Sequence, residues 1–139
     1  MQTKPYRRTA NYYETDQMGI IHHSNYIRWF EEARIDMLEQ IGLGYAQMEK
    51  DGVLIPVLAV DCRYKKVVHF NDTVDIYVKL LTFDGITMKI GYEIREVKTG
   101  ELCTTGESSH CFFDKNLKLL RLKRQYPHIY EILKSVCEG

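Results

Sequence analysis

One helix-period stripe followed by a long run of strand-period segments is the feature that most limits how this chain can fold. The stripe recurs at steps of three and four residues, the spacing of one helix face, in Tyr26, Phe30, Ala33, Met37 and Ile41. From residue 53 onward apolar residues instead alternate with polar neighbours, most regularly over residues 74–80 and 86–94. The apolar face of such a sheet needs a cover, and only this helix is long enough to provide it. The order of elements predicts an α+β fold, in which a curved antiparallel sheet wraps around one long central helix.

Local turn chemistry sets the expected limits of the elements. Ser24 or Asn25 can cap the helix at its start, and Gly42 and Gly44 supply the stop. Glycine-containing turns at residues 83–86 and 98–101 predict hairpins between consecutive strands. A first strand is expected to begin near residue 3 and to end near Tyr13, and a short helix is expected at 45–50. Further strands are expected at 53–63, 102–113 and 117–122, and a C-terminal helix at Pro127.

Length and charge exclude several classes of protein. A chain of 139 residues suits one domain, over residues 1–139. The 19 Lys and Arg residues balance 19 Asp and Glu residues, so nothing favours wholesale binding of nucleic acid or of an anionic membrane. The longest apolar run, residues 54–60, is far shorter than the about 20 residues of a membrane span, and residues 1–8 lack the apolar core of a secretory signal. We therefore expect a cytoplasmic protein with no integral membrane segment.

The sequence carries no motif for a metal, a redox dithiol or a nucleotide. Its four cysteines form no C-x-x-C pair, so buried free thiols are expected. His22 and His23 lack a carboxylate or H-E-x-x-H partner, and side chains of adjacent loop residues should point apart. His110 and Cys111 should face opposite sides of a strand, which argues against a Cys-His nucleophile. We expect neither a metal nor a cofactor.

The connector between the first strand and the helix concentrates the reactive groups. Asp16 lies on a turn followed by Ile20 and Ile21, so its carboxylate could sit near a water-poor pocket that raises its basicity. Such a group suits a general base or a nucleophile, and the alternative is an Asx-turn in which Asp16 only bonds its own backbone. The helix start that follows leaves backbone N–H groups unpaired, and its first turn holds no acidic residue. An oxygen that gains negative charge would be stabilised there, the alternative being ordinary capping.

This connector resembles the active-site signature of the hot-dog-fold acyl-CoA thioesterases. The resemblance is strongest to the 4-hydroxybenzoyl-CoA thioesterase type and its Tol-Pal-associated branch, and it rests on the run Thr15-Asp16-Gln17-Met18-Gly19-Ile20-Ile21-His22-His23-Ser24-Asn25-Tyr26 followed by Trp29. It implies a hot-dog fold and hydrolysis of an acyl-CoA thioester to a carboxylic acid and free coenzyme A. By position, Asp16 matches the catalytic aspartate, as nucleophile or as general base, and the backbone N–H of His23 matches the group that polarises the carbonyl. Substrate contacts are implied for Gly19, Ile20, Ser24, Asn25 and Tyr26.

The resemblance also implies a subunit interface. Family members bind coenzyme A between subunits, with the phosphates met by basic residues, and Lys65 and Lys66 are the candidates in this chain. Unpaired edge strands of the predicted sheet favour a symmetric partner, so a homodimer or homotetramer is expected. Two alternatives remain open for the function: an acyl carrier protein instead of coenzyme A as the acyl carrier, and a non-catalytic acyl-CoA-binding module.

Overall fold

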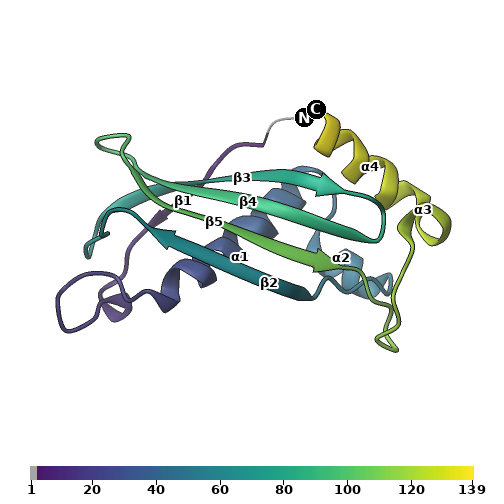
Figure 1. Cartoon of the computed structure of the whole chain (residues 1–139), viewed down its shortest axis with the longest axis horizontal. Helices are drawn as coiled ribbons and strands as arrows, with labels where there is room; N and C mark the ends of the chain where they lie inside the picture. Colours follow the sequence, from purple (N-terminus) through teal and green to yellow (C-terminus); the bar gives the residue numbers. More distant parts are fainter. Residues whose placement is uncertain (1–2) are drawn as a thin grey trace.

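The computed structural model describes residues 3–139 and consists of one antiparallel sheet with a long helix across it (Figure 1). The sheet has five strands in the order β1-β3-β4-β5-β2. The strands are β1 (Tyr6–Thr9), β2 (Val57–Tyr64), β3 (Thr73–Phe83), β4 (Thr87–Glu96) and β5 (Leu102–Cys111), and the helices are α1 (Ser24–Gln40), α2 (Tyr45–Lys50), α3 (Leu122–Gln125) and α4 (Pro127–Glu138). The predicted α+β architecture is confirmed.

Helix α1 packs its apolar stripe against the inner face of the sheet, as its period predicts. Phe30 and Met37 are buried in this contact, and the Phe30 ring stacks on Tyr92 of β4 with the ring centres 4.4 Å apart. Gly106 of β5 makes the close approach possible, because a Cβ at this position would lie 2.5 Å from a Phe30 ring carbon. Larger side chains would force the helix away from the sheet.

The hairpins form where the turn residues predict them. β3 pairs with β4, and β4 pairs with β5, both antiparallel. Gly85 has a φ of +89° and Gly100 a φ of +72°, the left-handed conformation that glycine adopts without strain. The side chain of Asp84 accepts the backbone N–H groups of Ile86 and Thr87 at 2.9 and 2.7 Å, which closes the first hairpin as an Asx-turn. The short helix expected at residues 45–50 is also present, as α2.

Two expected strands end differently in the structure. The first strand stops at Thr9, and Tyr12–Glu14 forms a 3-10 turn (η1), because the side chain of Glu14 turns inward and accepts the N–H of Asn11. The prediction of a strand at residues 117–122 is also wrong. Leu119 makes only an isolated bridge to Phe113, and Leu117 has a φ of +62°, which breaks an extended run before α3 begins.

Strand β2 is an open edge of the sheet. It pairs with β5 on one side, and seven of its eight residues are exposed. Four of these exposed side chains are large and apolar or aromatic: Val57, Leu58, Val60 and Tyr64. A long exposed apolar edge is a surface onto which another strand can pair.

No helix within residues 3–139 has the length and apolarity to cross a bilayer.

Candidate active site

A short hairpin-like loop carries both predicted catalytic groups. At its base the carbonyl oxygen of Glu14 accepts the backbone N–H of His22 at 2.8 Å. One rung further out, the N–H of Asp16 donates to the carbonyl oxygen of Ile20, also at 2.8 Å. Gly19 closes the tip with a φ of +77°, a conformation that a β-carbon would strain. The loop is therefore an ordered structure that fixes where Asp16 and His23 lie.

The carboxylate of Asp16 has one occupied oxygen and one free oxygen. Oδ1 accepts the N–H of Met18 at 2.7 Å, which is the Asx-turn that the sequence left open as an alternative. Oδ2 has no hydrogen-bond partner among residues 3–139, and the residue is half-buried. The turn orients the carboxylate without using up its capacity to accept a proton or to attack a carbon.

The start of α1 is capped in an unexpected way. Neither Ser24 nor Asn25 is the N-cap, and the predicted capping is wrong. His23 occupies the N-cap position, and Nδ1 of His22 instead accepts the Ser24 N–H at 3.2 Å while lying 2.9 Å from the Ser24 hydroxyl. The N–H of Asn25 donates to the carbonyl oxygen of His22.

One backbone donor is left over at this helix start. The first turn of α1 contains no acidic residue. Within the part of the chain that the structure describes, the N–H of His23 donates to no acceptor, whereas those of His22 and Ser24 are both paired. The positive end of the helix dipole lies at this position, so the N–H can stabilise an oxyanion.

The two adjacent histidines do not point apart. Their rings stack with centres 4.1 Å apart and an interplanar angle of 29°, because His22 folds back to bond Ser24 and lies over its neighbour. The expectation that these side chains diverge is wrong. Among residues 3–139 no group of three or more His, Cys, Asp or Glu side chains could hold a metal ion.

Of the residues predicted to contact substrate at the helix start, two are buried. The Asn25 amide donates to the carbonyl oxygen of Glu14 at 3.0 Å, so it ties the helix to the base of the loop. The Tyr26 ring packs against Trp29 and Tyr64, and burial raises the pKa of its hydroxyl to about 12. Ile20 is half-buried, whereas Gly19 and Ser24 are exposed. Substrate contact by all five residues stays a prediction.

The two lysines lie directly after β2. Both backbone N–H groups donate to the carbonyl oxygen of Cys103, at 2.9 Å for Lys65 and 3.0 Å for Lys66. The Lys65 side chain is exposed. Lys66 is paired with Glu101, and the hydrogen bond between them raises the pKa of the lysine. Binding of phosphate by these lysines also stays a prediction.

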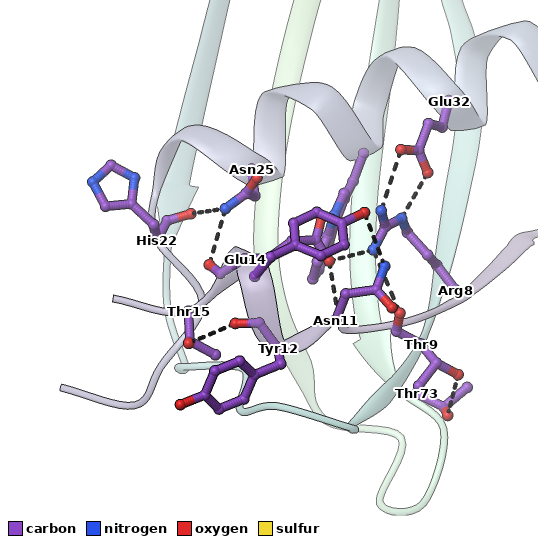
Figure 2. A network of polar contacts seen from close by, with 12 residues as sticks. Arg8, Thr9, Asn11, Tyr12, Glu14, Thr15, His22, Asn25, Glu32 and Thr73 are labelled. Atoms are coloured by element: carbon purple, nitrogen blue, oxygen red, sulfur yellow. Dashed lines mark hydrogen bonds and ion pairs between the residues drawn. The ribbon is translucent and has the colours of Figure 1, made fainter. Parts of the chain in front are cut away.

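The functional feature that the sequence reasoning missed is a buried carboxylate two residues before Asp16. The side chain of Glu14 is only 3% exposed, and it accepts hydrogen bonds from Arg8 at 2.6 Å, from the Asn11 N–H at 2.9 Å and from the Trp29 indole at 2.8 Å (Figure 2). Burial alone would raise the pKa of Glu14, but these hydrogen bonds outweigh it and hold the pKa below its ordinary value. The Asn-x-x-Glu spacing, similar to a capping box, was the signal available in the sequence.

A groove on the outer face of the sheet lies away from the candidate site. It has a volume of about 880 Å³ and is lined by outward-facing side chains of the sheet, among them Asp61, Arg63 and Lys79, and by the end of α4. None of the predicted site residues lines it. The hydroxyl of Tyr64 donates to the carbonyl oxygen of His23 at 3.1 Å, so the candidate site borders the open edge β2 instead.

Comparison with known proteins identifies the family of this chain. The family model "Thioesterase-like superfamily" matches residues 11–132. A Bacillus subtilis protein described as "Putative acyl-CoA thioesterase YneP" is 37% identical over 119 residues, which cover 85% of this chain and 86% of that protein.

Two solved structures are similar along almost the whole chain. The DHNA-CoA thioesterase of Staphylococcus aureus is 35% identical with a TM-score of 0.91, over 96% of this chain and 89% of that one. A Thermus thermophilus protein described as a hypothetical protein is 28% identical with a TM-score of 0.88, over 96% of this chain and 99% of that one. The chain belongs to the thioesterase-like superfamily and is a thioesterase with the hot-dog fold.

Proposed function

We propose that this thioesterase hydrolyses acyl-CoA to a carboxylic acid and free coenzyme A, with Asp16 and the backbone N–H of His23 as its reacting groups. The observation that carries the proposal is that one ordered loop holds a carboxylate with a free oxygen and an unpaired N–H at a helix start. A carboxylate and an oxyanion donor are the two groups that attack on a thioester requires. The name of the Bacillus subtilis relative supports acyl-CoA as the substrate class.

The reaction follows from these two groups. Asp16 either attacks the carbonyl carbon or removes a proton from the water that does so, and the carbonyl oxygen becomes an oxyanion. The His23 N–H donates to that oxygen, a contribution of about 3 to 4 kcal/mol for a preorganised donor. The C–S bond breaks, and the coenzyme A thiolate leaves and takes up a proton. On the nucleophilic route, water then hydrolyses the acyl-aspartate anhydride and restores Asp16.

The site is proposed to be completed by a second copy of the chain. The groove of about 880 Å³ on the sheet is not lined by the site residues, and the exposed β2 edge touches the site through Tyr64 and His23. Antiparallel pairing of β2 with its copy would bury this edge and enclose the acyl group near Gly19 and Ile20. Lys65 and Lys66 are the proposed contacts for the coenzyme A phosphates.

The proposal also covers the subfamily of the thioesterase, its acyl group and its acyl carrier. We propose that the chain belongs to the 4-hydroxybenzoyl-CoA type and its Tol-Pal-associated branch. The name of the first and that of the Staphylococcus aureus structure both favour an aromatic acyl group. The second candidate function uses the same site on an acyl carrier protein. Basic side chains at Lys65 and Lys66 would suit its acidic surface as well as they suit phosphate.

A thiol-release assay tests the proposal. The purified chain is incubated with benzoyl-, 1,4-dihydroxynaphthoyl- and straight-chain acyl-CoA, and with the matching acyl carrier protein thioesters. We expect turnover of at least one acyl-CoA, with a higher kcat/KM than for the same acyl group on the carrier protein. A preference for the carrier protein would support the second candidate. Tight acyl-CoA binding without thiol release would contradict catalysis and support a binding module.

A further inference from the structure

We propose that Glu14 is a positioning residue, whose buried carboxylate fixes the loop that holds Asp16 and the His23 N–H in register. The inference rests on the proposed function, since it concerns the geometry of that same site. The Glu14 side chain is buried, and its carboxylate makes no hydrogen bond to Asp16 or His23. It acts through the backbone that both groups share.

The side chain of Glu14 joins three separate parts of the fold. Its Oε1 accepts N–H groups from the Arg8 guanidinium of β1 and from the Asn11 backbone at the N-cap of η1. Its Oε2 accepts the Trp29 indole N–H of α1. The Arg8 guanidinium also lies over the Trp29 ring, 4.9 Å from its centre. Because the strand, the turn and the helix all bond one carboxylate, that carboxylate cannot shift without moving all three.

The backbone of the same residue forms the base of the catalytic loop. The Glu14 carbonyl oxygen accepts both the His22 N–H at 2.8 Å and the Asn25 amide at 3.0 Å. Asp16 follows two residues after this rung on one side, and His23 follows one residue after it on the other. The rung also occupies the His22 N–H, which leaves that of His23 as the unpaired donor.

The arrangement needs a carboxylate at this position. All three groups that face the side chain are N–H donors, and an ionised carboxylate can accept from all of them. A glutamine of the same shape can accept with its oxygen only, and its NH₂ group would face another donor. Glu14→Gln therefore keeps the volume of the side chain but loses at least one of the three contacts.

Glu32→Gln is the matched control. Glu32 accepts hydrogen bonds from the Tyr6 hydroxyl at 3.1 Å and from the same Arg8 at 2.7 Å. It makes no hydrogen bond to the loop at residues 14–22, and Figure 2 shows its carboxylate on the far side of Arg8 from Glu14. The two variants thus remove one carboxylate each from the same network. Only Glu14→Gln removes a carboxylate that also holds the loop.

The experiment measures kcat, KM and amide hydrogen exchange for both variants and the wild type. In Glu14→Gln we expect kcat to fall by about 10- to 100-fold with KM within about twofold, since a small misplacement of reacting groups costs rate more than binding. Exchange at the His22 amide should speed up while amides in the middle of α1 stay protected. Glu32→Gln should keep kcat within about threefold of wild type and leave His22 protected.

Several results would overturn the inference. These are a normal kcat in Glu14→Gln, an equal loss in both variants, or a His22 amide that stays protected in Glu14→Gln. If Glu14→Gln does not fold, Trp29→Phe removes one of the three donors to the Glu14 carboxylate. The inference then predicts a lower kcat and faster exchange at the His22 amide in Trp29→Phe, and the absence of both effects would overturn it. A wild-type chain that hydrolyses no acyl thioester would contradict the proposed function, whereas the exchange measurement still tests the positioning role.

Discussion

The Tyr64 hydroxyl, at the end of the edge strand β2, donates to the carbonyl oxygen of His23 at 3.1 Å. This contact joins the open edge of the sheet to the start of α1. The rings of the two residues also meet edge to face, with their centres 6.4 Å apart. Whatever covers β2 therefore comes close to the candidate oxyanion donor, and four consequences of the structure can be tested.

Replacing Asp16 by Asn should remove most of the activity and leave the fold intact. The Asn oxygen can still accept the Met18 N–H, so the Asx-turn survives, but the side chain can neither attack nor accept a proton from water. We expect kcat to fall by about 10² to 10⁴. Asp84→Asn is the control, because Asp84 forms an equivalent turn in the β3–β4 hairpin. Equal turnover in both variants would remove Asp16 from the mechanism.

His23 offers a test of the backbone N–H itself. Its φ of −54° lies within the range that proline adopts, so His23→Pro can keep the helix start while deleting the N–H. We expect kcat to fall by about 10² to 10³ in His23→Pro, the cost of one oxyanion donor. His23→Ala keeps the N–H and should lose less than about tenfold. If the alanine variant loses as much as the proline variant, the imidazole and not the backbone is the acting group.

A charge on β2 should disrupt assembly. Val60→Lys places an ammonium group on the exposed edge, where a second β2 strand would have to pair, and charged edge strands resist such pairing. Light scattering after size exclusion should show the wild type as a dimer or tetramer and Val60→Lys as a smaller species with a lower kcat/KM. Thr9→Lys on the opposite edge, β1, should leave both unchanged. A wild type that is a fully active monomer would refute completion of the site by a partner.

A buried polar chain beneath α1 predicts how stability depends on pH. Arg34 donates to the Tyr92 hydroxyl at 3.1 Å, Tyr92 lies 2.6 Å from the Ser108 hydroxyl, and Ser108 lies 2.7 Å from Nε2 of His110. His110 is fully buried. Burial, followed by the cationic Arg34, lowers the pKa of His110 to about 4.

Whether stability rises or falls with pH depends on which state, folded or unfolded, is protonated first as the pH falls. An unfolded histidine has a pKa of about 6.5, so the unfolded chain is protonated before the folded one as the pH falls. The stabilising effect of neutral His110 is complete above pH 6.5 and is lost progressively toward pH 4. Urea unfolding should show that the wild type loses about 2 kcal/mol more than His110→Gln between pH 7.5 and 5. His128 is exposed, so His128→Gln is the control and should lose as much stability as the wild type between pH 7.5 and 5. If the wild type and His110→Gln lose the same stability over this range, His110 is not the group responsible.

The amino-acid sequence by itself determined the elements whose cause is local. The helical period places α1, and the glycine turns place the β3–β4 and β4–β5 hairpins, because each signal lies within the element that it specifies. The motif around Asp16 and His23 likewise placed the proposed reacting groups on one connector. These predictions did not require knowing which elements pack against one another.

Only the tertiary structure decided which partner satisfies each polar group. Glu14 meets Arg8 from β1 and Trp29 from α1, and this pairing turns the expected end of the first strand into a 3-10 turn. Hydrogen bonds of this kind depend on distances between segments that are remote along the chain, and neither a hydrophobic period nor a turn motif contains those distances.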